Sequence, residues 1–253
     1  MKKRTFLAAA CAAVMSLASA LPAAADKIML AADAEYPPFN YKNDSGEIVG
    51  FDVEISLAVC EASGLDCEFT AQAWDGLIPG LLIGKFNAIS ASMFATEERR
   101  KQVDFTDKLY QTPSQFLAAK GSDIEISVAG LTGKTVGAQR GSVQADHLEA
   151  TYGATSTVQL YDTQDQANLD LAAGRLDALL GEVIALTEGF MASETGQGFD
   201  WTGPEVKLGD GIAIAIRKED TDLRDKLNAG IAAIRESGQY QEISEKFFGR
   251  DIY

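Results

Sequence analysis

One short pattern occurs twice in this chain. Residues 81–89 read Leu-Leu-Ile-Gly-Lys-Phe-Asn-Ala-Ile, and residues 171–179 read Leu-Ala-Ala-Gly-Arg-Leu-Asp-Ala-Leu. Each copy predicts the end of an amphipathic helix, then a glycine suited to the left-handed conformation that ends a helix, then an apolar run short enough for a buried strand. Polar residues follow both runs, Ser-Ala-Ser at 90–92 and Gly-Glu at 181–182. Because ligands lie at the carboxyl ends of strands in open α/β sheets, the repeat predicts two α/β lobes that share one site.

The N-terminal residues are expected to be a targeting segment rather than part of the fold. Residues 1–25 combine a positively charged start, an apolar stretch and small residues before Asp26, which is typical of a cleaved secretory signal peptide. A membrane anchor is disfavoured because the apolar stretch is short and rich in alanine. Cys11 as a lipoprotein acceptor is disfavoured because only about five apolar residues precede it. We therefore expect an extracytoplasmic protein.

Charge limits the partners. The chain of 253 residues carries a formal net charge of −15, and an acidic surface argues against nucleic acids and anionic membranes. The charge does not identify the ligand, since the lining of a cleft can differ from the rest of the surface.

Two cysteines follow the predicted signal peptide, Cys60 late in a predicted helix and Cys67 in the following strand. In an oxidising compartment such a pair is typical of a disulfide. A zinc site is the competing interpretation, but it requires three or four ligands, and the single histidine, His147, is distant in sequence. No metal is expected.

The remaining pattern divides the chain into alternating strands and helices. Helix starts are expected at four capping residues, Asp52, Thr96, Thr163 and Thr221. Strands are predicted at 27–32, 67–71, 117–119, 135–138, 157–161 and 211–217. Junctions between the lobes are expected near residues 110–114 and 205–211, so that two hinge strands connect a first lobe of residues 26–112 and 210–253 with a second lobe of residues 113–209.

No catalytic motif is evident. The chain holds no Gly-x-Ser-x-Gly elbow, and nothing in it resembles a phosphate loop, a nucleophile–base pair or a metal cluster. A binding protein without a cofactor is therefore favoured over an enzyme.

The order of seven short motifs makes the chain resemble a known family. The motifs are Asp-x-x-Tyr-Pro-Pro-Phe at 33–39, Gly-Phe-Asp-Val at 50–53, Trp-Asp-Gly-Leu-Ile-Pro at 74–79, Thr-Glu-x-Arg at 96–99, Phe-Thr-Asp at 105–107, Gly-Arg-Leu-Asp-Ala at 174–178 and Arg-Lys-Glu-Asp at 217–220. Their order and spacing are similar to those of the periplasmic polar amino-acid-binding proteins of ABC importers (solute-binding protein family 3), in the branch for lysine/arginine/ornithine, histidine and opines. The resemblance implies a type II periplasmic-binding-protein fold, with the ligand in the cleft between two lobes. It also implies the Cys60–Cys67 disulfide.

The resemblance implies a role for each polar group of an amino-acid ligand. Arg99 matches the arginine that clamps the carboxylate, where a guanidinium gives a planar bidentate fit. Backbone N–H groups at Ser142 would assist at a helix start. Glu182 matches an acidic position, usually Asp, that accepts the ammonium, and Ser92 matches a hydroxyl contact. Without the motif, Arg99 could equally be a solvated helix charge, and Ser92 a small polar residue that ends a strand.

The side chain of the ligand would be held by three further residues. Tyr36 and Trp74 match the two residues that sandwich it, and aromatic faces suit a cation. Either could instead be ordinary core. Asp33 matches the acid that often reaches a distal amine or guanidinium, although glutamine binders of the family can carry the same residue.

Three positions depart from the pattern of the family. Ala91 and Phe94 stand where relatives often have Ser or Thr, and Val143 replaces a common Thr. The carboxylate site is therefore expected to depend more on Arg99 and on backbone groups, and a bulky or non-standard amino acid is an alternative ligand.

The expected function is capture of a polar, basic amino acid (Arg, Lys, ornithine or His) in the periplasm by a monomer that docks transiently on an ABC permease. Two alternatives stay open: a cyclohexadienyl dehydratase on the same fold, with Glu182 as the acid, and delivery of the ligand to a membrane sensor.

Overall fold

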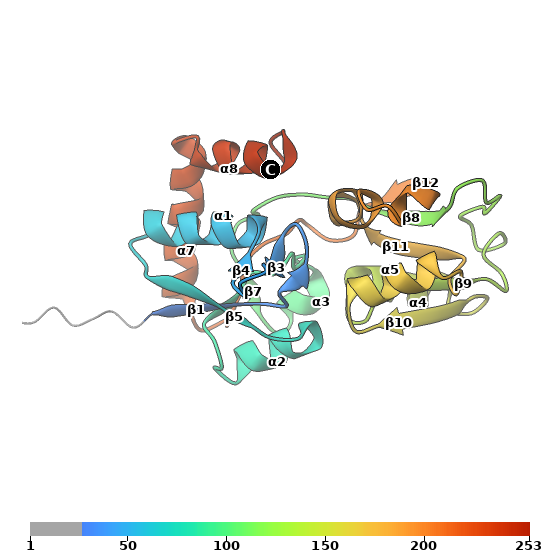
Figure 1. Ribbon diagram of the computed structural model, residues 1–253. Coiled ribbons are helices and arrows are strands. Elements are labelled where there is room, and N and C mark those ends of the chain that lie inside the picture. Colours follow the sequence, from blue (N-terminus) through green and yellow to red (C-terminus); the bar gives the residue numbers. More distant parts are fainter. Residues whose placement is uncertain (1–26) are drawn as a thin grey trace, which may run out of the picture.

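Two five-stranded sheets organise the chain (Figure 1) in a computed structural model that describes residues 27–253. The predicted signal peptide lies outside the described residues. We call the part built on the β5-β1-β6-β13-β7 sheet the first lobe and the part built on the β10-β9-β11-β8-β12 sheet the second lobe. Figure 1 shows them side by side, joined by two extended segments.

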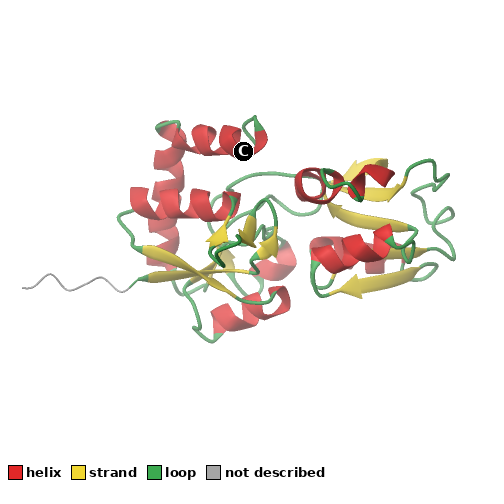
Figure 2. Cartoon of the chain, in the orientation of Figure 1, coloured by secondary structure: helices red, strands yellow, loops and turns green. Residues whose placement is uncertain are grey.

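The first lobe is a mixed sheet with helices on both faces (Figure 2). β1 pairs in parallel with β5 and β6, whereas β13 runs antiparallel to β6 and β7. Its strands are β1 (Ile28–Ala32), β5 (Cys67–Ala71), β6 (Ala88–Ile89), β7 (Asp104–Phe105) and β13 (Ala215–Ile216). A small antiparallel sheet is attached to it, formed by β2 (Glu35–Tyr36), β3 (Asn40–Lys42) and β4 (Ile48–Val49).

The alternation of side chains along the strands builds two cores in this lobe. Leu30 and Ile214 face a core shared with α1 (Phe51–Ala62), α7 (Thr221–Glu236) and α8 (Gln239–Phe248). Ala31 and Ile89 face the opposite core, which is closed by α2 (Leu77–Leu82) next to the 3₁₀ turn η1 (Trp74–Gly76). The short helix α3 (Glu97–Arg100) lies between β6 and β7 in sequence.

The second lobe repeats this plan. Its core on one face of the sheet includes Leu148 of α4 (Val143–Tyr152), and its core on the other face includes Leu171 of α5 (Gln164–Ala172). The strands are β8 (Ser114–Ala119), β9 (Thr135–Gln139), β10 (Thr157–Tyr161), β11 (Ala178–Glu182) and β12 (Phe199–Val206). After β11 come α6 (Val183–Ala185), a π-helical turn η2 (Leu186–Met191) and η3 (Gly196–Gly198).

The chain crosses between the lobes after β7 and again after β12. The two crossing segments pair where the N–H of Ile212 donates to the carbonyl of Tyr110 at 2.9 Å and the N–H of Leu109 donates to that of Ile212 at 2.8 Å. The N–H of Gln111 also donates to the carbonyl of Ile252, near the C-terminus, at 3.1 Å. The exact lobe boundaries stay a prediction.

The repeated sequence pattern has the conformation expected from it. Gly84 and Gly174 both have positive φ angles, 75° and 70°, and they precede β6 and β11 respectively. Thr96 and Thr163 cap their helices, since their side chains accept hydrogen bonds from the N–H groups of Arg99 and Gln166.

Other local predictions were wrong. Gly50 occupies the N-cap of α1, and Asp52 lies inside the helix, buried, with its carboxylate turned to other partners. Helix α7 begins at Thr221 with Asp220 at the cap position, so Thr221 is the first helical residue rather than the cap. The strand expected over 211–217 is reduced to Ala215–Ile216.

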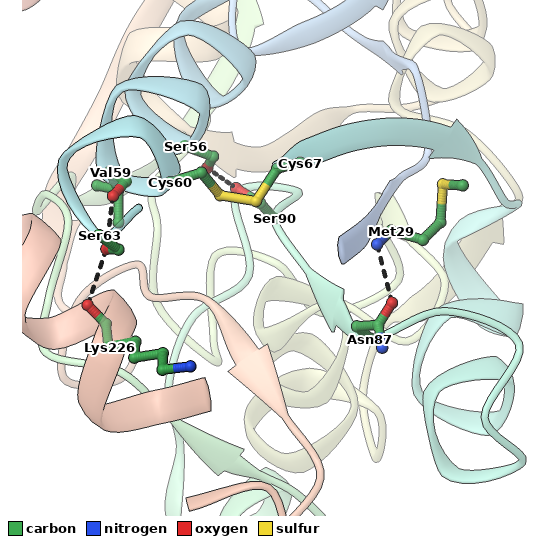
Figure 3. The surroundings of a disulfide bond; sticks show 9 residues. All are labelled: Met29, Ser56, Val59, Cys60, Ser63, Cys67, Asn87, Ser90 and Lys226. Carbon is green, nitrogen blue, oxygen red and sulfur yellow. Dashed lines mark hydrogen bonds between the residues drawn. A yellow bond between two sulfur atoms is a disulfide. The ribbon is translucent and has the colours of Figure 1, made fainter. Parts of the chain in front are cut away.

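The predicted disulfide is present (Figure 3). Cys60, near the end of α1, is bonded to Cys67 at the start of β5, and their Cα atoms are 6.1 Å apart. A hydrogen bond of 2.7 Å between the hydroxyls of Ser56 and Ser90 ties the same helix to the residue after β6. Within residues 27–253, no helix has both the length and the apolar character needed to span a membrane.

Candidate functional site

A cavity with about 330 Å³ of empty space lies between the two lobes. That space includes volume open to solvent, and residues of both lobes surround it. All seven ligand-binding residues predicted from the sequence line it. The lining residues are Asp33, Tyr36, Trp74, Ala91, Ser92, Phe94 and Arg99 from the first lobe, and Gln139, Ser142, Val143, Gln144 and Glu182 from the second.

Several polar residues of this cavity lie at or just after the ends of strands. Asp33 follows β1, Ser92 follows β6 by three residues, Gln139 ends β9 and Glu182 ends β11. Because the carboxyl ends of parallel strands lie on one edge of a sheet, each lobe presents its polar edge to the other.

Arg99 is a buried cation in the cavity wall. Its side chain belongs to α3, and the residue is only 9% exposed. Nη1 donates to the carbonyl of Phe94 at 2.8 Å, and Nη2 donates across the cleft to the carbonyl of Gly141 at 3.1 Å. A guanidinium has five N–H donors, so further donors can reach an anionic ligand group. Burial lowers the pKa of Arg99 to about 10, which leaves it charged at neutral pH.

Two carboxylates, Asp33 and Glu182, line the same cavity. Within residues 27–253, the Oδ1 atom of Asp33 and the Oε1 atom of Glu182 are buried and have no hydrogen-bond partner. Glu182 is 1% exposed, and its burial, together with the charge of Asp52, holds its pKa well above the usual range. Burial and the same Asp52 charge raise the pKa of Asp33 to about 7. Each carboxylate therefore lacks the partner that a cationic group would supply.

Two aromatic residues complete the wall. The hydroxyl of Tyr36 donates across the cleft to Oε2 of Glu182 at 3.3 Å, and its ring stacks on Phe39. Trp74 lies in η1, with the guanidinium carbon of Arg99 5.4 Å from the centre of its ring.

Ser142 begins α4 but leaves its own N–H unavailable. Its hydroxyl accepts from the N–H of Ala145 at 3.1 Å, and its N–H donates to the carbonyl of Gln139 at 3.2 Å. The first-turn N–H groups left for a ligand carboxylate are those of Val143 and Gln144. The role expected for the backbone N–H groups at Ser142 stays a prediction.

Asp52 is a residue that the sequence analysis assigned wrongly. Its carboxylate accepts from the N–H of Ser92 at 2.7 Å, from the Ser92 hydroxyl at 3.0 Å and from the Tyr110 hydroxyl at 2.8 Å. These bonds hold Ser92 in a left-handed conformation with φ of 49°, which a serine seldom adopts. Asp52 does not line the cavity itself, but it fixes the conformation of Ser92, which does.

Gln139 and Gln144 also line the cavity, although the sequence analysis did not select them. Their position at the end of β9 and the start of α4 is the sequence feature that could have identified them as lining residues. The departures from the family pattern, Ala91, Phe94 and Val143, also face this cavity and make part of its wall apolar. Among residues 27–253, no group of three or more His, Cys, Asp and Glu side chains could hold a metal ion.

Two α/β lobes around one polar cavity define a solute-binding protein. Residues 28–250 match the model of the bacterial extracellular solute-binding proteins, family 3, and the chain belongs to this family.

Named relatives cover the whole chain. The L-arginine-binding protein of Pseudomonas aeruginosa is 40% identical over 100% of this chain and 99% of its own length. The histidine-binding periplasmic protein of Salmonella typhimurium is 37% identical over the same shares. A solved structure of an ancestral arginine-binding protein bound to arginine has a TM-score of 0.82 and 32% identity, covering 88% of this chain and 98% of that one. These relatives are binding proteins rather than enzymes.

Proposed function

We propose that this protein captures a basic amino acid, with arginine as the first candidate, and delivers it to an ABC permease. One observation carries the proposal: a single cavity holds a buried guanidinium, Arg99, together with two carboxylates, Asp33 and Glu182, that each keep a buried oxygen without a partner. An amino acid with a cationic side chain has one anionic group and two cationic groups, which complements this set.

Each ligand group has a proposed partner. Arg99 and the N–H groups of Val143 and Gln144 hold the α-carboxylate, since charge-assisted hydrogen bonds are strong in a buried site. Glu182 accepts the α-ammonium. Tyr36 and Trp74 flank the aliphatic stem, and Asp33 accepts the distal cation.

Binding and closure are coupled in this proposal. The Tyr36–Glu182 and Arg99–Gly141 hydrogen bonds join the two lobes across the cleft. A ligand that contacts both lobes favours the closed state over the open one. The closed form is then the one that docks on the permease, as a monomer in the periplasm. The same closed form would serve a membrane sensor.

A dehydratase function is not favoured. A substrate with two carboxylates, such as prephenate, would meet Asp33 and Glu182 in the same small cavity. Both acids would have to stay protonated to avoid repulsion between like charges.

A thermal-shift panel tests the proposal on refolded, ligand-free protein. A ligand that binds only the native state raises the melting temperature. We expect shifts with arginine, lysine, ornithine or histidine that exceed those with glutamine and glutamate. Asp33→Asn should weaken basic ligands selectively, whereas Glu182→Gln should weaken every amino acid. A response to glutamate or prephenate alone would overturn the proposal.

A further inference from the structure

A second cavity lies against the outer side of Asp33. It contains about 830 Å³ of space that includes open solvent, and we call it the vestibule. The vestibule and the ligand cavity share three lining residues, Asp33, Trp74 and Gln139. These three residues lie where the ligand cavity and the vestibule meet, and we call them the partition.

The partition does not include the residues proposed to hold the α-carboxylate and the α-ammonium. Arg99 and Glu182 line the ligand cavity and do not line the vestibule. Asp33, proposed to accept the distal cation, faces both spaces. The side-chain end of a bound ligand therefore points at the vestibule.

Both lobes contribute residues to the partition. Trp74 comes from the first lobe and Gln139 from the second, where its side-chain amide donates to the carbonyl of Asp162 at 3.3 Å. To reach the vestibule, a substituent on the distal nitrogen must pass between these side chains.

The vestibule favours positive charge. Asp33, Glu35, Asp75 and Asp162 line it, with Lys42 as the cation among its lining residues. Asp162 also has a partner outside the lining set, because Nε of Arg140 lies 3.4 Å from its Oδ1. The unpartnered, buried Oδ1 of Asp33 needs a positive group at the junction of the two spaces.

We infer that the site binds basic amino acids that carry an alkyl substituent on the terminal side-chain nitrogen, with the substituent in the vestibule. The inference rests on the proposed function and extends its ligand class. An N-alkylated guanidinium keeps its charge for Asp33, and the added carbon atoms lie against the Trp74 ring, as in the aromatic recognition of methylated cations.

Calorimetric titration of the refolded protein with L-arginine, Nω,Nω-dimethylarginine and Nω-propylarginine tests the inference. We expect both substituted ligands to bind within about tenfold of arginine. Nα-methylarginine, substituted at the end proposed to contact Arg99 and Glu182, should bind about a hundredfold more weakly. Nω-propylarginine binding as weakly as the Nα-substituted ligand would overturn the inference. Failure of arginine itself to bind would instead overturn the proposed function.

A variant that fills the vestibule tests whether the substituent of the ligand lies there. Ala71 lines the vestibule but not the ligand cavity, and it is exposed at the end of the edge strand β5. Ala71→Trp should leave the Kd for arginine within about twofold and weaken Nω-propylarginine by at least about tenfold. Leu169→Trp, at an exposed position on α5, is the matched control and should change neither value. Equal weakening of both ligands by Ala71→Trp would contradict the placement.

Discussion

The hydroxyl of Tyr36 donates to Oε2 of Glu182 over 3.3 Å, and this hydrogen bond joins the first lobe to the second. Glu182 is longer by one methylene than the Asp expected at its position, and its carboxylate is shared between the tyrosine and the cavity, where Oε1 has no partner. One carboxylate can thus hold the cleft closed through one oxygen and accept a ligand ammonium through the other.

Tyr36→Phe keeps the ring and removes this bond. A hydrogen bond to a charged group contributes about 1.5–3 kcal/mol, so we expect the Kd for arginine to rise about tenfold or more in calorimetry. Tyr41→Phe is the control, because Tyr41 lies on the neighbouring strand β3 and does not line the ligand cavity. An unchanged Kd in Tyr36→Phe would show that the bond does not contribute to the closed, bound state.

Arg99→Lys tests the carboxylate clamp. Lysine keeps the charge but loses the planar donors that reach Phe94 and Gly141 together. We expect a loss of about 2 kcal/mol of binding free energy, roughly thirtyfold in Kd, for every amino-acid ligand. Arg100→Lys, at the exposed neighbouring position, should bind as the parent does. Equal affinities of Arg99→Lys and Arg100→Lys would show that Arg99 does not bind the ligand carboxylate.

The pH dependence of binding follows from Asp33 and Glu182. Both pKa values are raised in the folded protein, that of Asp33 to about 7, so the ligand-free protein binds protons that the unfolded chain has released. The free energy of unfolding of the ligand-free protein should therefore fall as pH rises from about 4 to about 7. A cationic ligand prefers the ionised carboxylates, and its affinity should rise across the same range.

Proton release measures this linkage. Titrations with arginine near pH 6, in buffers of different ionisation enthalpy, should show release of about one proton or more on binding. Asp33→Asn should reduce the number released, whereas Asp44→Asn, at an exposed carboxylate outside the ligand cavity, should not. Proton uptake on binding, or no change in Asp33→Asn, would contradict the assignment of Asp33.

The disulfide should affect stability and leave binding unchanged. Cys60 and Cys67 lie seven positions apart in sequence, and closing this short loop contributes about 2–3 kcal/mol. The Cys60→Ser/Cys67→Ser double variant should melt about 5–10 °C lower in a protein of this size. Its Kd for arginine should equal that of the parent protein, since neither cysteine lines the cavity. A large change in Kd would indicate that the cavity depends on this bond.

The sequence was most informative where local chemistry decides the structure. Gly84 and Gly174 mark helix stops that precede strands of the two sheets, and Thr96 and Thr163 cap helices as their spacing predicts. Asp52 was wrongly predicted to be an N-cap because an acidic residue at a helix start is typical of a cap. Its actual partners, Ser92 and Tyr110, lie 40 and 58 residues away.

Features that depend on tertiary contacts were missed. Strand β12 was not predicted because it is an edge strand with Gly203 and Pro204 within it, a composition more typical of a loop. Gln139 carries no charge, and nothing in its local sequence shows that a second lobe would bring Trp74 beside the same cavity.

Calorimetric comparison of L-arginine with L-citrulline on refolded, ligand-free protein tests the central claim most directly. The two ligands share size and shape, but citrulline replaces the guanidinium with a neutral urea group. We predict that arginine binds at least about a hundredfold more tightly, because Asp33 holds a buried oxygen that only a cation satisfies fully. Equal affinities, or binding of citrulline alone, would contradict a site built for a basic amino acid.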